Sequence, residues 1–204
     1  MTPPPSKLLF LPSASGSMQF WRPTADLLTH PARKVHIGWP GLGSTPVDPS
    51  VTGFTDLVAR VVAEIDQPTA LIAQSMGGVV AMLAALERPE QVSHLVLAAT
   101  SGGMDMASLG AQDWRPLFTA ENRTVPQWFI EHHEDLTHRL AELRMPVLLL
   151  WGDADPISPV GVGQRLAALL PRAELHVFPG AGHRLAKNLA VQVAPLIDRH
   201  LARS

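Results

Sequence analysis

Serine, aspartate and histidine can together perform nucleophilic catalysis, and in this sequence one residue of each type follows a short apolar run. Ser75, Asp155 and His183 occur in that order along the chain. An imidazole can take the proton of a serine hydroxyl, and a carboxylate can orient the imidazole and stabilise its protonated form. We therefore take these three residues as candidates for a catalytic triad.

The serine lies in the clearest of the three motifs. Ser75 is followed by Met76 and Gly77 in the segment Ala-Gln-Ser-Met-Gly-Gly, which separates an apolar run from a segment of helical periodicity. A serine at a tight strand-to-helix turn is the setting of a nucleophile elbow. The alternative interpretation is an ordinary helix start, with serine as the N-cap.

The acid and base candidates lie in turns that follow later apolar runs. Asp153 and Asp155 share the turn after residues 147–151, and an aspartate there either caps its own backbone or points into a site. We expect Asp153 to do the first and Asp155 the second. His183 ends a glycine-rich loop, which is suitable for a general base that reaches across a site.

Short apolar runs alternate with helical segments along most of the chain. The runs are 8–11, 35–37, 70–73, 95–99, 147–151 and 175–178, and the helical segments are 54–65, 76–86, 160–170 and 189–201. Continuously apolar strands that alternate with helices predict a buried, parallel sheet. We predict an α/β protein, with a doubly wound, mostly parallel sheet of about six strands and helices on both faces, in a single domain over 1–204.

In these motifs the sequence resembles the α/β-hydrolase superfamily, specifically its small esterase and lactonase-like members. The resemblance spans nearly the whole chain, and Ala73 replaces the first glycine of the elbow. It implies a minimal form of the fold, without the usual leading hairpin and with a short lid. The matching segments are Gly38–Gly43, residues 73–78, Leu150–Pro156 and Gly180–His183.

The resemblance also implies an oxyanion hole made of two backbone amides. Met76, directly after the serine, supplies one of them. In the loop after the first strand the family usually has His-Gly, whereas this chain has Pro12, Ser13 and Ala14. Proline has no N–H, so Ala14 is the expected second donor and Ser13 is the alternative.

Residues 101–145 interrupt the alternation of strands and helices. No strand is expected there, and the segment is either a long crossover connection or a small lid over a pocket. Trp128 and Met104 from this segment, together with Trp39, are our candidates for an apolar substrate pocket, although methionine more often fills cores.

Composition and charge limit the classes of partner that this protein can have. The 16 Lys and Arg nearly balance the 18 Asp and Glu, so we expect no nucleic-acid partner. No apolar run is long enough for a signal or a membrane span, and there is no cysteine, which favours the cytoplasm without membrane association. The cluster at 131–135 lacks the spacing of a metal site, and we expect neither metal nor cofactor.

These features predict a serine hydrolase that cleaves a small carboxylic ester, lactone or thioester through an acyl-enzyme on Ser75. A cofactor-free perhydrolase, an acyltransferase and a carbon–carbon bond hydrolase would keep the same triad. A non-catalytic ligand-binding module is the alternative from another class. The sequence gives no indication of oligomeric state.

Overall fold

The computed structural model describes residues 3–203 and contains one six-stranded sheet, in the order β2-β1-β3-β4-β5-β6. Every pair of neighbouring strands is parallel. The strands are β1 (Lys7–Leu11), β2 (Arg33–His36), β3 (Thr69–Gln74), β4 (Val92–Ala98), β5 (Val147–Gly152) and β6 (Ala173–Phe178). The predicted α/β class and number of strands are confirmed.

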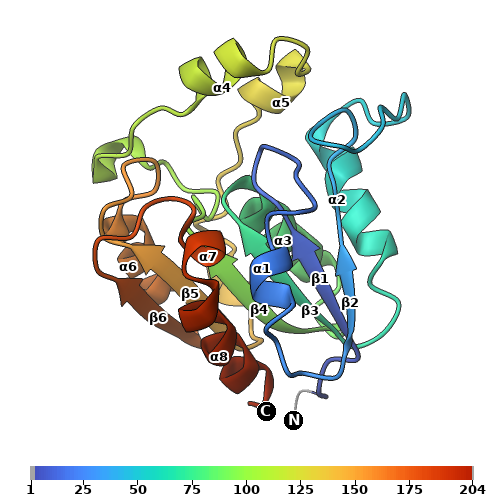
Figure 1. Ribbon diagram of the computed structural model, residues 1–204, viewed down its shortest axis with the longest axis vertical. Coiled ribbons are helices and arrows are strands. Elements are labelled where there is room, and N and C mark those ends of the chain that lie inside the picture. The colour runs from blue at the N-terminus through green and yellow to red at the C-terminus, as the bar shows by residue number, and fades with distance from the viewer. Residues whose placement is uncertain (1–2, 204) are drawn as a thin grey trace.

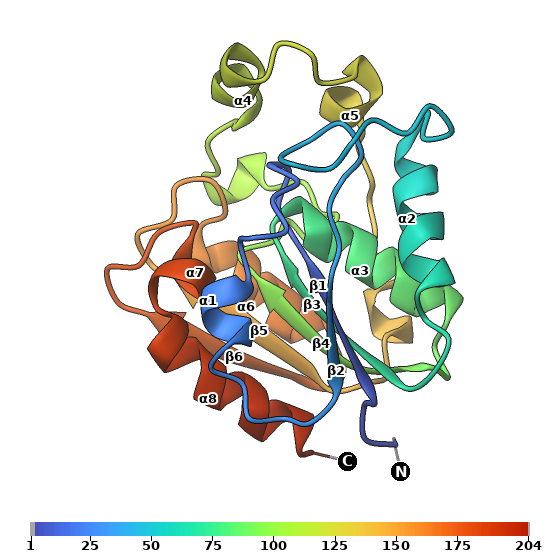
Figure 2. The ribbon, with the colours of Figure 1, turned by 45° about the vertical axis from the view of Figure 1, so that its right-hand side comes forward.

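Helices cover both faces of this sheet (Figures 1 and 2). One apolar cluster joins the sheet to α2, α3 and α6, and a second joins the opposite face to α1, α7 and α8. The helices are α1 (Arg22–Ala25), α2 (Phe54–Ala63), α3 (Met76–Glu87), η1 (Ala107–Leu109), α4 (Arg115–Glu121), α5 (Gln127–Glu131), η2 (Leu140–Glu142), α6 (Val160–Leu169), α7 (Leu185–Asn188) and α8 (Ala190–Leu201). Within residues 3–203, no helix combines the length and apolarity that a membrane span needs.

The four inner strands β1, β3, β4 and β5 are buried at every position, because helices exclude water from both faces. The edge strands β2 and β6 are more exposed, and β2 begins with Arg33 and Lys34. The chain reverses its direction across the sheet between β1 and β3. In open α/β sheets, ligands bind at the carboxyl ends of the strands beside such a reversal.

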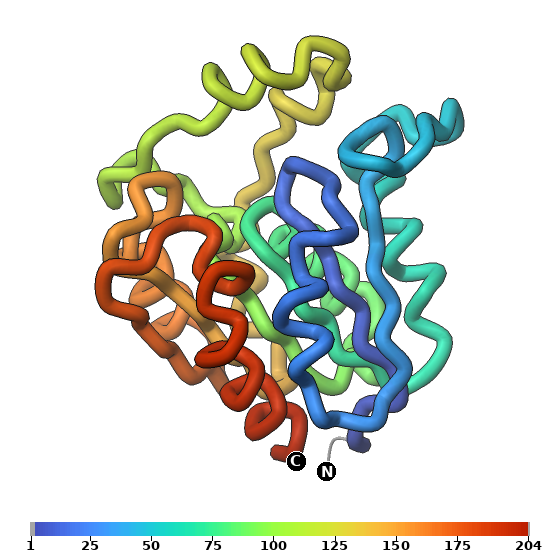
Figure 3. The backbone as a smooth tube through the Cα atoms, in the orientation of Figure 1, coloured from blue at the N-terminus to red at the C-terminus, as the bar shows by residue number. Residues whose placement is uncertain are grey.

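The four longer predicted helices are present, whereas α1 and α7 were not predicted. Each of these two has four residues, which is too short to show a helical period in the sequence. Residues 101–145 contain no strand, as expected. They hold η1, α4, α5 and η2 and, with the adjoining turns, form what we call the β4–β5 segment, which arches over the carboxyl end of the sheet (Figure 3).

Two histidines lie in the interior between β4 and α8. The rings of His94 and His200 meet edge to face, with centroids 5.2 Å apart, and both residues are buried. Burial, followed by the charges of His94 and Arg203, lowers the pKa of His200 from 6.5 to about 3, although Glu174 opposes the shift. Burial also lowers the pKa of His94.

These shifts predict a loss of stability in mild acid. Below pH 6.5 His94 and His200 are protonated in the unfolded chain but stay neutral in the folded protein until the pH is lower. The free energy of unfolding therefore falls as the pH falls. The slope is at most about 1.4 kcal/mol per pH unit for each such proton. Urea unfolding between pH 7.5 and 5 measures it, and His200→Leu reduces the slope. Equal slopes for the two proteins would contradict the prediction.

Candidate active site

Ser75 occupies a strained turn between β3 and α3. Its φ of 56° and ψ of −125° place it in a region that side chains rarely adopt. The Ser75 amide donates to the carbonyl of Ala98 at 2.9 Å, which ties the turn to the end of β4. The sharp reversal matches the nucleophile elbow expected from the sequence.

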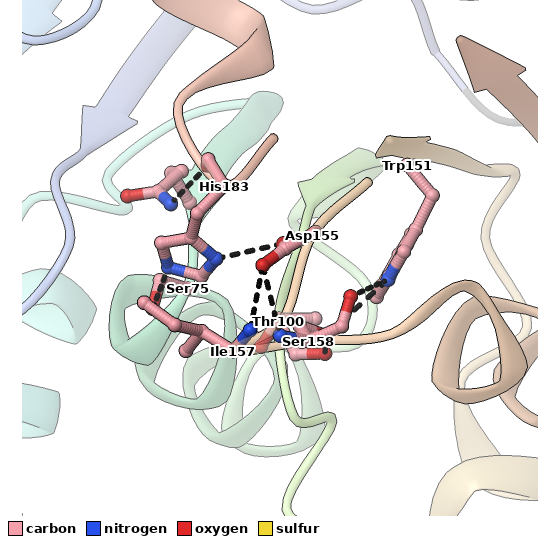
Figure 4. A network of polar contacts seen from close by, with 8 residues as sticks. Ser75, Thr100, Trp151, Asp155, Ile157, Ser158 and His183 are labelled. Atoms are coloured by element: carbon pink, nitrogen blue, oxygen red, sulfur yellow. Dashed lines mark hydrogen bonds and ion pairs between the residues drawn. The ribbon is translucent and has the colours of Figure 1, made fainter. Parts of the chain in front are cut away.

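The structure brings the three candidate triad residues together (Figure 4). Ser75 Oγ lies 3.0 Å from His183 Nε2, and His183 Nδ1 lies 2.8 Å from Asp155 Oδ2. The side chain of Asp155 is fully buried, and that of His183 is 17% exposed. The hydroxyl, imidazole and carboxylate therefore form one continuous hydrogen-bonded chain across three loops.

The second oxygen of Asp155 is fixed by its own loop. Asp155 Oδ1 accepts from the amides of Ile157 at 2.9 Å and Ser158 at 3.1 Å. Ser158 is anchored in turn, since its hydroxyl donates to the carbonyl of Thr100 and its carbonyl accepts from Trp151 Nε1 (Figure 4). Sequence analysis did not single out Ser158 or Thr100, because both are ordinary polar residues until the fold places them beneath the carboxylate.

Asp153 joins two loops and does not cap its own turn. Its side chain is exposed, and Oδ1 accepts from the amide of Gly180 at 2.6 Å, which links the loops after β5 and β6. The same two loops touch at Gly152, where an added Cβ would lie 2.0 Å from the carbonyl oxygen of Ala181. Asp155 points into the site as expected, through Oδ2 to His183. The expectation that Asp153 caps its own backbone is wrong, because Oδ1 of Asp155 takes that role for the turn.

The loop after β1 lies against the first turn of α3. Gly77 makes this possible, because a Cβ there would lie 2.3 Å from the carbonyl oxygen of Pro12. Ala14 and Met76 consequently line one cavity with Ser75, while Ser13 is outside its wall. Met76 is the first residue of α3, so its amide has no partner within the helix.

A cavity of about 650 Å³ opens above Ser75 and His183, within the usual range of small-molecule sites. The β4–β5 segment supplies much of its wall, and the Gln112 amide ties that segment to the loop of Asp155 by donating to the Pro156 carbonyl at 2.8 Å. The larger apolar side chains of the wall are those of Phe54, Met76, Val79, Met104, Met106, Trp114, Phe129 and Ile157.

Only one of the three predicted pocket residues lines this cavity. Met104 belongs to the wall, whereas Trp39 and Trp128 do not. Trp39 is buried beneath the loop after β1, where its Nε1 donates to the carbonyl of Ser13 at 2.9 Å. Successive helical side chains point about 100° apart, so on α5 it is Phe129, and not Trp128, that reaches the cavity.

Four of the five residues of the 131–135 cluster, at 132–135, also border the cavity. Among the described residues, no three His, Asp or Glu side chains are placed to hold a metal ion. The ring of His132 stacks on that of Phe54, with centroids 3.7 Å apart and planes within 6°, which connects the β4–β5 segment to α2. Burial lowers the pKa of His132 below 6.5, against the opposing charge of Glu134.

Comparison with known proteins agrees with this geometry. Residues 8–137, more than half of the chain, match the model of the alpha/beta hydrolase family. The chain belongs to the alpha/beta hydrolase family. Residues 123–186 also match a model of the alpha/beta hydrolase fold, a range that includes Asp155 and His183.

Relatives and solved structures extend the comparison. A 2-hydroxy-6-oxononadienedioate/2-hydroxy-6-oxononatrienedioate hydrolase of Burkholderia vietnamiensis is 28% identical over 222 residues, covering 84% of this chain and 77% of that protein. A thermophilic esterase from Thermogutta terrifontis has a TM-score of 0.77 and 19% identity, with 97% and 90% of the two chains covered. MenH from S. aureus has a TM-score of 0.77 and 19% identity, with 96% and 93% covered. The two structures establish the likeness of the fold.

The close approach at Gly77 predicts a strong effect of one methyl group. In Gly77→Ala, the new Cβ meets a backbone carbonyl that cannot move aside cheaply, so we expect a loss of about 1–3 kcal/mol in the free energy of unfolding. Displacement of the loop that carries Ala14 should also lower hydrolase activity. Denaturant unfolding and kinetics on the same samples measure both effects.

Gly161→Ala is the matched control. Gly161 lies in the first turn of α6, and nothing lies within 4 Å of an added Cβ. Alanine favours a helix over glycine by up to about 1 kcal/mol, so this variant should be as stable as the wild type or slightly more stable. Equal losses in the two variants would show that the contact with Pro12 is not the cause.

Proposed function

We propose that this chain is a serine hydrolase that cleaves small carboxylic esters, including lactones and thioesters, through an acyl-enzyme on Ser75. The observation that carries the proposal is the unbroken hydrogen-bonded chain from Ser75 through His183 to Asp155, placed at the floor of a largely apolar cavity. A binding module would have no need for a strained serine aligned with an imidazole and a buried carboxylate.

In the proposed acylation step, Ser75 Oγ attacks the ester carbonyl while His183 Nε2 takes the hydroxyl proton. Asp155 Oδ2 accepts from Nδ1 of His183, which holds the ring in the productive tautomer and stabilises the imidazolium. The amides of Met76 and Ala14 stabilise the tetrahedral oxyanion. The ester C–O bond then breaks, and His183 passes its proton to the leaving alcohol.

Deacylation repeats the same steps with water as the nucleophile. His183 takes a proton from the water, and the hydroxide adds to the acyl carbon. The second tetrahedral intermediate collapses with release of the acid, and the proton returns to Ser75 Oγ. The β4–β5 segment acts as the lid in this proposal, because it supplies much of the apolar wall and limits the access of bulk water.

A carbon–carbon bond hydrolase is the second candidate, since relatives 26–28% identical to this chain are named 2-hydroxy-6-oxononadienedioate/2-hydroxy-6-oxononatrienedioate hydrolases. Their named substrates are dioates, which bear two carboxylates. The rim of the cavity carries four carboxylates, and Arg115 is the only Lys or Arg side chain among the described residues that line it. Arg115 already donates to the Ile130 carbonyl and to Asp113. This charge balance favours a neutral substrate.

The ester hydrolase proposal predicts turnover of p-nitrophenyl esters from acetate to octanoate. We expect the highest kcat/KM between butyrate and octanoate, because the cavity has room for an apolar acyl chain. Ser75→Ala should lower kcat by on the order of 10⁴-fold or more. Turnover that survives in Ser75→Ala, or none in the folded wild type, would contradict the proposal.

The rim charges predict discrimination against anionic esters. We expect p-nitrophenyl hydrogen adipate to react with a kcat/KM about fivefold or more below that of p-nitrophenyl hexanoate, and salt to narrow the ratio. Asp113→Asn and Asp135→Asn should narrow it too, because asparagine keeps the oxygen that each turn uses as an acceptor but removes the charge. A preference for the adipate would favour the dioate hydrolase candidate.

A further inference from the structure

Gln74, directly before Ser75, is a polar residue at the end of an otherwise mainly apolar strand. It is only 1% exposed. Alternation along β3 places its side chain on the same face as Ile72, which packs in the apolar cluster with α1, α7 and α8. Because α7 begins two residues after His183, the Gln74 amide is buried beside the backbone that carries the imidazole.

One hydrogen bond joins these two elements. Nε2 of Gln74 donates to the main-chain carbonyl of His183 at 3.1 Å. His183 is therefore attached twice to the same turn, through its backbone to Gln74 and through its ring to Ser75. Once the backbone is held, the ring can move only by its two side-chain torsions, and Asp155 restricts those.

Stability alone does not account for a glutamine here. Oε1 of Gln74 is buried and has no hydrogen-bond partner among the described residues. A buried acceptor without a partner destabilises the folded state, whereas an apolar side chain of the same length would avoid that cost. The side-chain amide therefore lowers stability through Oε1, while Nε2 holds the main chain of His183.

We infer that Gln74 is a positioning residue, which holds the main chain of His183 so that the imidazole stays within reach of Ser75. The inference rests on the proposed function, because it concerns the hydrolysis at Ser75. Gln74 does not touch the reacting atoms. It acts on the rate by keeping the base in place over the glycine-containing loop that precedes α7.

The test is Gln74→Met, which keeps the length of the side chain and removes both the donor and the unpartnered oxygen. We expect kcat for p-nitrophenyl butyrate to fall by about tenfold to a hundredfold, since small misplacements of a catalytic group cost that much. KM should change less than twofold, and the thermal midpoint should stay level or rise. A fall in activity without a fall in stability is not expected of a merely structural residue.

A second measurement needs no substrate. We expect the proton between His183 Nδ1 and Asp155 to give a resonance far downfield in one-dimensional NMR spectra of the wild type, and this resonance should weaken or broaden in Gln74→Met. A folded wild type that shows this resonance but no ester turnover would contradict the proposed function. The positioning of His183 by Gln74 would then be decided by comparing this resonance between the wild type and Gln74→Met. An unchanged resonance in Gln74→Met would overturn the inference.

Ile72→Val is the matched control, because Ile72 lies on the same strand and face and has no bond to His183. It should lower the thermal midpoint with little change in kcat. The inference is overturned if Gln74→Met retains kcat within threefold of wild type. It is also overturned if its loss of kcat equals that of Ile72→Val at the same loss of thermal midpoint.

Discussion

The carboxylate of Asp155 is fully buried, and a charge in that position is tolerated only when hydrogen-bond donors surround it. The donors come from three sources: the amides of Ile157 and Ser158 on one oxygen, and the imidazole of His183 on the other. This requirement brings the loops after β5 and β6 together. Ser158 is in turn fixed by Thr100 and Trp151, so the end of β4 is drawn into the same cluster.

The parallel sheet makes this convergence possible. Because all six strands run in one direction, every loop that follows a strand emerges at the same edge, and the β4–β5 segment lies over that edge. At the reversal between β1 and β3, the loop after β1 leads to α1 on one face of the sheet and the turn after β3 leads to α3 on the other, which leaves room for a cavity. Close approach of backbone to backbone at Gly77 and Gly152 then brings the loops into contact.

The site is built at some expense of stability. Ser75 is held at a positive φ, Gln74 buries an oxygen without a partner among the described residues, and a carboxylate is removed from water. The two apolar clusters on the faces of the sheet compensate for these costs, since they bury nearly all of the four inner strands. The separation is spatial, because the strain lies at the carboxyl edge and the packing lies in the layers beneath it.

The sequence by itself was sufficient for the sheet, the longer helices and the three residues that meet at the site. Those features depend on local signals: apolar runs, helical periodicity, and a serine, an aspartate and a histidine each placed just after a strand. Their order along the chain and their position after parallel strands were enough to predict that Ser75, Asp155 and His183 would converge.

Only the tertiary structure decided what surrounds them. Trp39 and Trp128 are of the residue type expected in an apolar pocket. Trp39 instead supports the loop of Ser13, and Phe129 lines the cavity in place of Trp128. The direction in which a side chain points from a helix or a loop is set by packing. Gln74 and Ser158 bond to residues 109 and 58 positions away, to His183 and Thr100. No local pattern encodes such pairs, since their geometry exists only after the sheet has assembled and brought distant backbone carbonyls beside them.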